Sequence, residues 1–169
     1  MAGCVKVEAR WHKARCLVIE KHNSLLHLAD LAVGAPIPRI QCPPGYTAIL
    51  YAQGASSPDG LAFSPSGVLH VAEETAGRVS RIEPGERITT TVVSSLRNPE
   101  GIAFDADANL YVVEDVQNGR LVQVTPDGDT TELATGLDVP EGVIWAPDST
   151  TYITESNAEG LDPPTSRLE

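Results

Sequence analysis

Three acidic residues recur at one fixed interval, and their type and spacing suit the binding of a cation. Asp59, Glu100 and Glu141 stand 41 residues apart, each between a proline and a glycine. Carboxylate oxygens are preferred ligands of hard cations such as Ca²⁺ and Mg²⁺, and converging carboxylates need a cation or hydrogen-bond donors between them. A polar residue between proline and glycine is also a common choice in turns. The pattern therefore has two interpretations, a divalent-metal site or turn chemistry.

A second acidic set keeps the same interval. Glu73, Glu114 and Glu155 stand 41 residues apart, and each ends a short apolar run, as Glu20 also does. In an antiparallel hairpin the start of one strand lies beside the end of the next, so we expect this set at the same rim as the first. These glutamates would either contact the metal ligands without touching the metal, or accept hydrogen bonds from backbone N–H groups between neighbouring units.

The elements that must position both sets are short strands. Each Pro-x-Gly phrase opens an apolar run, a turn rich in Ser, Pro, Asp and Gly follows, and a second apolar run ends in glutamate. This order is typical of an antiparallel hairpin, and a period of about 40 residues is typical of four-stranded propeller blades. The sequence predicts an all-β propeller with strands near 60–63, 68–73, 78–83, 88–93, 101–104, 110–114, 120–124 and 130–134.

The interval divides the 169 residues into about three and a half units, which we treat as one domain. They are a degenerate first blade with a Pro-rich insertion (1–57), two blades (58–98 and 99–139) and an incomplete blade (140–169). Register predicts a β-hairpin over 16–30 with Glu20 in the place of Glu73, although local pattern offers a helix from Leu25 to Val33. We expect either a fragment of a longer propeller or a ring closed by two copies. An open blade face then predicts self-association.

The composition of the chain limits the classes of molecule that it is expected to bind. The net charge of −11 argues against nucleic acid and anionic membranes. No apolar run approaches the ~18 residues of a membrane span, and no signal core is evident. Cys4, Cys16 and Cys42 form no CxxC pair and suit a reducing compartment, so we expect a cytoplasmic protein. A small-molecule substrate is the expected partner.

The repeated phrases resemble the family of senescence marker protein 30 and gluconolactonase, which are six-bladed β-propellers. The resemblance rests on residues 58–63, 99–104 and 140–145 with their glutamate-ending strands, and it covers 47–160 well and 16–30 weakly. NHL-repeat proteins, strictosidine-synthase-like proteins and virginiamycin B lyase have similar blades. The family holds a divalent metal at its axis on acidic or amide residues of such phrases. Position by position, this implies Asp59, Glu100 and Glu141 as ligands of Ca²⁺, Mg²⁺ or Zn²⁺, although this chain has no asparagine at any of them.

The resemblance implies a metal-dependent hydrolase of a lactone or related ester. In that chemistry the metal polarises the carbonyl and helps to generate hydroxide while a carboxylate acts as base, and the sequence assigns no residue as that base. The alternatives are an NHL-type binding or scaffold propeller without chemistry and a propeller lyase. A polar axial cavity would favour the enzyme, and an axis filled by apolar side chains would favour the scaffold.

Overall fold

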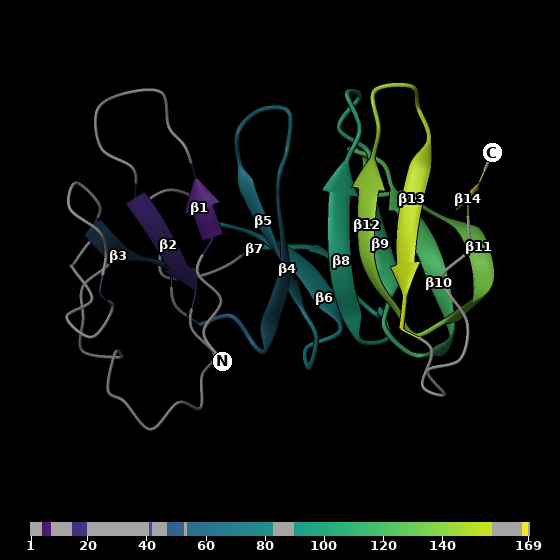
Figure 1. Ribbon diagram of the computed structural model, residues 1–169, viewed down its shortest axis with the longest axis horizontal. Helices are drawn as coiled ribbons and strands as arrows, with labels where there is room; N and C mark the ends of the chain where they lie inside the picture. The colour runs from purple at the N-terminus through teal and green to yellow at the C-terminus, as the bar shows by residue number, and fades with distance from the viewer. Residues whose placement is uncertain are drawn as a thin grey trace.

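The chain is built from strands that form four sheets in succession (Figure 1). This computed structural model describes residues 5–7, 15–19, 41, 47–52, 54–82, 90–156 and 167–168. Within these ranges every regular element is a β-strand, which confirms the predicted fold class. The same ranges contain no helix long and apolar enough to cross a membrane.

Two four-stranded antiparallel sheets occupy the centre, and we name them blade A and blade B. Blade A consists of β4 (Pro58–Phe63), β5 (Leu69–Glu73), β6 (Arg78–Ile82) and β7 (Thr90–Val93), paired in that order. Blade B consists of β8 (Pro99–Phe104), β9 (Leu110–Glu114), β10 (Gln117–Val124) and β11 (Thr130–Asp138), also paired in order. All eight strands predicted over this part of the chain are confirmed.

A third sheet, blade C, continues the series. Its strands are β12 (Pro140–Trp145), β13 (Thr151–Glu155) and β14 (Arg167–Leu168), and both pairings are antiparallel. The sequence places a third strand at this point because residues 166–169 resemble the third strand of blade A, and β14 confirms it.

The N-terminal sheet differs from the blades in its pairing. It contains β1 (Val5–Val7), β2 (Arg15–Ile19) and β3 (Thr47–Ala52). The β1–β2 pair is antiparallel, whereas β2 and β3 run parallel. The first strand of the hairpin predicted over 16–30 therefore has a counterpart in β2. Most of the hairpin predicted over 16–30, including Glu20, and the competing helix over 25–33 lie outside the described residues.

Opposite faces of each blade pack against different neighbours, because side chains alternate along a strand. Blade A contributes Ala72 and Val79 to a buried cluster with Ile102 and Val112 of blade B. Blade B in turn contributes Tyr111 and Val113 to a cluster with blade C, and β3 covers the other face of blade A through a cluster of its own. The core is thus a set of apolar layers between successive blades, as expected for stacked repeats.

Blade C leaves more of its corresponding face exposed. Ile144 and Tyr152 pair across β12 and β13 and are 61% and 40% exposed. The equivalent of Tyr152 in blade B is Tyr111, which is only 3% exposed because blade C covers it. An exposed apolar face is the feature from which the sequence predicts self-association, and that association itself stays a prediction.

Candidate metal centre

A β-bulge at the start of the first strand of each blade holds the acidic residue of the Pro-x-Gly phrase. In blade A, Pro58 pairs with Glu73 and Leu61 pairs with Val71, so β4 has one more residue than β5 between the two pairs. Blades B and C repeat this extra residue around Glu100 and Glu141. A bulge bends the strand and re-aims its side chains. The same local distortion therefore presents all three acidic residues at the same rim.

The glycine of each phrase lets neighbouring first strands approach closely. A Cβ on Gly60 would collide with the carbonyl oxygen of Glu100. A Cβ on Gly101 would lie 2.5 Å from the carbonyl oxygen of Glu141 and 2.8 Å from the amide nitrogen of Val143. The first strands β4, β8 and β12 can nest in this way only because these positions carry no side chain. The nesting brings the acidic residues of successive blades together.

Glu100 is the electrostatic centre of this arrangement. Burial, a hydrogen bond with Asp115 and the negative charges of Asp59, Asp115 and Glu141 together raise the pKa of Glu100 to about 8. The three acidic residues that the sequence singles out are thus close enough to influence one another. With Asp115 they form a group of four carboxyl side chains, which we call the acidic cluster.

Asp115 is the member that sequence reasoning missed. Its Oδ1 atom is buried and has no hydrogen-bond partner among the described residues. Asn98 holds the rest of the residue, since its Nδ2 donates to the carbonyl oxygen at 3.1 Å and to Oδ2 at 3.3 Å. The available signal was a break in the repeat, because the equivalent positions 41 residues away are Glu74 and Ser156.

These residues fit a divalent cation in chemical terms. Two carboxyl groups in hydrogen-bond contact need a proton or a cation between them, and the buried Oδ1 of Asp115 offers a vacant lone pair. Oxygen-only donors suit Ca²⁺ or Mg²⁺ better than Zn²⁺, which favours nitrogen and sulfur ligands. Over the part of the chain that the structure describes, no three acidic, histidine or cysteine side chains already stand at metal-ligand geometry. Exposed Asp59 and Glu141 would therefore have to turn inward to complete a shell.

The second acidic set has a different environment, and we call Glu73, Glu114 and Glu155 the blade-end glutamates. Each accepts a hydrogen bond from the backbone N–H group of the residue 17 positions earlier. The donors are Ser56, Arg97 and Asp138, at 2.7, 3.0 and 2.7 Å. Of the two roles that the sequence offers, these contacts support acceptance of backbone N–H groups. Glu20, the fourth candidate of this set, lies outside the described residues.

Arginines neutralise the two fully buried members of the set. Glu73 receives Nε of Arg78 at 2.7 Å and the hydroxyl of Ser80 at 2.5 Å. Burial raises the pKa of Glu73, but these hydrogen bonds outweigh it and lower the pKa below its ordinary value.

Glu114 lies between two arginines. It receives Nε of Arg120 at 2.8 Å and Nε of Arg97 at 2.9 Å. Burial raises the pKa of Glu114 as well, and the bonds from both arginines lower it overall. Glu73 and Glu114 are therefore committed to ion pairs within the blades, and they offer little to a metal.

Solved β-propellers match this chain. A gluconolactonase from Xanthomonas campestris has a TM-score of 0.53 at 19% identity, over 65% of this chain and 40% of that one. Regucalcin from Agrobacterium tumefaciens, a calcium-binding protein, has a TM-score of 0.50 at 18% identity, over 62% and 39%. Virginiamycin B lyase from Staphylococcus aureus has a TM-score of 0.50 at 22% identity, over 58% and 34%.

The chain forms part of a β-propeller, and its blades are similar in structure to those of the matched gluconolactonase and regucalcin. It spans 34–40% of the length of these three structures, and at such low identity the likeness establishes the fold without the activity. No family model and no curated protein matches the sequence.

Proposed function

We propose that the acidic cluster binds a divalent cation and that the propeller to which these blades belong hydrolyses a lactone or related ester. The observation that carries the proposal is the buried Oδ1 of Asp115, which has no partner among the described residues and lies beside a carboxyl group that holds its proton to about pH 8. A buried, unsatisfied carboxylate oxygen is costly unless an ion or a proton completes it.

The roles of the individual residues follow from their contacts. Asp115 and Glu100 would provide the inner ligands, because they are in hydrogen-bond contact, and Asp59 and Glu141 would contribute further negative charge from the neighbouring blades. Asn98 orients Asp115 through its two hydrogen bonds. When bound, a divalent cation supplies Lewis acidity that polarises a carbonyl group. The Glu100–Asp115 pair holds a proton in the absence of a cation, so that binding must release it.

Two alternatives belong to other classes. A binding or scaffold propeller would use the cluster, if at all, to hold its blades together. A propeller lyase is the other alternative, and the match to virginiamycin B lyase at a TM-score of 0.50 keeps it open. The hydrolase is the leading candidate because two of the matched structures are described as a gluconolactonase and a calcium-binding protein.

Calorimetric titration of Ca²⁺ and Mg²⁺ into the full chain tests the cation site. We expect saturable binding at pH 7 with release of about one proton, seen as an enthalpy that depends on the ionisation enthalpy of the buffer. Asp115→Asn and Glu100→Gln should weaken binding at least about tenfold. Glu132→Gln is the matched control, because it removes a carboxylate that is paired with Arg120 at the surface.

The outcomes separate the candidate functions. Cation binding together with chelator-sensitive hydrolysis of aldonolactones by a complete propeller would support the hydrolase. Cation binding without turnover of any lactone or ester would favour the scaffold, and cleavage without net addition of water would favour the lyase. No saturable binding, or binding that both Asp115→Asn and Glu100→Gln leave unchanged, would eliminate the metal centre.

A further inference from the structure

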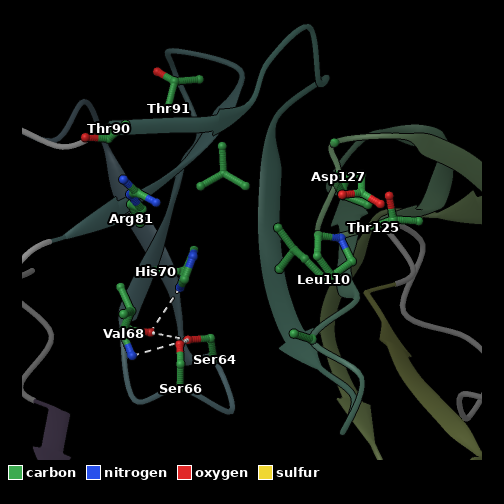
Figure 2. Close-up of a pocket in the computed structure, with 15 residues that line it drawn as sticks. Ser64, Ser66, Val68, His70, Arg81, Thr90, Thr91, Leu110, Thr125 and Asp127 are labelled. Carbon is green, nitrogen blue, oxygen red and sulfur yellow. Dashed lines mark hydrogen bonds between the residues drawn. The ribbon is translucent and has the colours of Figure 1, made fainter.

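The contact between successive blades repeats one pair of aromatic rings. His70 of blade A meets Phe104 of blade B at 4.7 Å between ring centroids. Tyr111 of blade B meets Trp145 of blade C at the same distance. Figure 2 shows this end of the contact between blades A and B, where His70 and Leu110 line one cavity between the two blades. A ring on each second strand thus receives a ring from the first strand of the next blade.

Blade C keeps its half of this contact without a partner ring. Tyr152 follows Tyr111 by 41 residues and is 40% exposed. Ile144, which pairs with Tyr152 across β12 and β13, is 61% exposed. No other aromatic ring of the described residues contacts Tyr152. We call the surface that these two residues form with Gly142 the open face of blade C.

The glycine of this face favours a strand as its occupant. A Cβ on Gly60 or Gly101 would meet the backbone of the next first strand. A Cβ on Gly142 would meet, among the described residues, only the side chain of Thr154 in the same blade. Glycine weakens a strand unless another backbone approaches it closely. The open face therefore carries the feature that admits a further first strand, although none lies there.

Blade A presents the complementary half at the other end of the series of blades (Figure 1). Phe63 precedes Phe104 by 41 residues and is 44% exposed. The described residues that cover this side of blade A belong to β3 and to Ala55 just after it. Blade B, in contrast, packs on blade C with residues from all four of its strands. The cover on blade A is thus partial and leaves Phe63 open to a further blade.

β3 occupies the place of a fourth strand. Ala52 and Ala55 pack on blade A. Val93 and Leu96, 41 residues later, pack on blade B in the same way. The fourth strands β7 and β11 pair antiparallel with third strands, whereas β3 pairs parallel with β2. β3 is therefore a fourth strand without the third strand of its blade, and blade C has three strands without a fourth among the described residues.

We propose that a second copy of this chain covers the open face of blade C, head to tail, and that two copies close one propeller. Blade C of each copy packs on blade A of the other, so that Tyr152 meets Phe63 and Gly142 nests against the bulge of β4. β14 then pairs antiparallel with β3 of the other copy in place of β2, which gives blade C its fourth strand. The same contact occurs twice about a two-fold axis.

The size of solved propellers favours two copies over an open filament. The part of this chain that matches the gluconolactonase accounts for 40% of that propeller, and the part that matches regucalcin accounts for 39%. Two such shares fit within one closed propeller, whereas three do not. A head-to-tail contact that closes leaves no unpaired end, while one that does not close grows without limit.

The closed ring also continues the acidic rim. Asp59 would lie beside Glu141 of the other copy, as it lies near Glu100 of its own chain. Neither the ring contacts nor the strand pairing involves a cation. Dimer formation and cation binding can therefore fail independently of each other.

Sedimentation velocity of the full chain tests this arrangement. The wild type should be a dimer at about 100 μM, since interfaces of standard size have dissociation constants of about 1 μM or lower. Ile144→Lys and Phe63→Lys should each raise the dissociation constant at least about tenfold, because each buries an unpaired ammonium group. Leu133→Lys is the matched control, since Leu133 is 46% exposed and belongs to neither face. It should leave the dimer unchanged.

A mixture of the two monomeric lysine variants is the sharper experiment. In a head-to-tail ring, one of the two contacts then joins two unmodified faces, so the mixture should form a dimer although each variant alone does not. That rescue also shows that both variants are folded. A dimer that joined two open faces of blade C would be insensitive to Phe63→Lys and would show no such rescue.

Amide hydrogen exchange of the wild type tests the strand pairing without any substitution. Exchange in β3 and β14 should slow as the protein concentration rises through the dissociation constant. Stability measurements on the single chain belong below that concentration, where the open face is free. A wild type that is monomeric at about 100 μM, assemblies that grow beyond the dimer, or a dimer that Phe63→Lys leaves unchanged would overturn the proposal.

Discussion

Two sets of carboxylates share one rim and one 41-residue interval, yet their environments are opposite. The blade-end glutamates Glu73 and Glu114 are fully buried, and each is paired with arginine. In the acidic cluster, Glu100 faces three other carboxyl groups, and its pKa rises to about 8 instead of falling. Repetition alone therefore does not determine the environment of a carboxylate. The distinguishing feature is whether the fold provides a compensating donor.

The geometry of the ladder explains the contrast. Glu73 and Glu114 each lie at the end of a second strand, where the third strand provides an arginine and the preceding loop provides an N–H group. A cluster residue lies in a bulge at the start of a first strand, beside the first strand of the next blade, which carries another acidic residue at the same level. The end of the second strand therefore brings opposite charges together, whereas the bulge of the first strand brings like charges together.

The largest effect is expected from removing a compensated charge. Glu114→Gln removes the buried anion to which Arg97 and Arg120 donate. Because those two side chains are 48% and 31% exposed and can regain water, we expect the free energy of unfolding to fall by about 3 kcal/mol, the lower end of the range for a broken buried pair. Glu132→Gln is the control, since its pair with Arg120 is exposed and should contribute at most about 1 kcal/mol. Urea unfolding of both variants gives the comparison. Equal costs would show that burial does not separate the two sets.

The next effect tests the contact between first strands. Gly101→Ala places a Cβ against the backbone of Glu141 and Val143, so we expect a cost of about 2–4 kcal/mol. Gly142→Ala meets mainly the hydroxyl of Thr154, a side-chain atom that can move, and should cost less. Thermal unfolding measures both. If Gly101→Ala costs no more than Gly142→Ala, close nesting does not hold the acidic cluster together.

The dependence of stability on pH should have opposite signs for the two sets. The pKa of Glu100 is higher in the folded state, about 8 against 4.5, so the folded state binds the extra proton and its stability falls as pH rises from about 4.5 to 8. With allowance for screening by solvent, we expect a loss of about 1–2 kcal/mol. Glu100→Gln should remove this loss and stabilise the protein at pH 8.

The blade-end glutamates provide the internal comparison for that measurement. The pKa values of Glu73 and Glu114 are lowered by folding, so their contribution is present above about 4.5 and lost as pH falls further. Urea unfolding from pH 3 to 9 should show both limbs. A curve for Glu100→Gln that still declines from pH 5 to 8 would contradict the assignment.

The smallest effect on stability is expected at the exposed face of blade C. Ile144→Lys should change the free energy of unfolding by at most about 0.5 kcal/mol, because Ile144 is 61% exposed. The same change should reduce any self-association of the wild type, as measured by sedimentation velocity, whereas Leu133→Lys on the outer strand of blade B should not. A cost above about 2 kcal/mol would show that this face is covered, as it is in blade B.

Much of this arrangement follows from the sequence. The interval of Pro58, Pro99 and Pro140 predicts the hairpins, and the strands of blades A and B occur where the pattern places them. Local rules suffice there, because proline, glycine and alternating apolar residues specify the turn, the close approach and the inward face. The gathering of Asp59, Glu100 and Glu141 also follows from equivalent positions in successive repeats.

What could not be predicted depends on departures from the repeat. The counterparts of Asp115 are Glu74 in blade A and Ser156 in blade C, so the acidic type is not kept in every blade, and the effect of Asp115 on Glu100 arises only through folding.

The arginine partners are offset, since Arg78 follows Glu73 by five residues and Arg120 follows Glu114 by six. The β9–β10 hairpin has one more residue between equivalent paired positions than the β5–β6 hairpin, which causes the offset. The sequence alone does not show which arginine pairs with which glutamate, because that pairing depends on the register of the strands.

The acidic residue at each bulge can change without a change in the strands around it. Asp59, Glu100 and Glu141 lie in the bulges, outside the regular pairing of the first and second strands. Exchanging any one of them therefore leaves the register of these strands unchanged. The three residues proposed as ligands can thus be varied one blade at a time. A duplicated blade would carry the same variable position, which makes this architecture a suitable starting point for new chemistry.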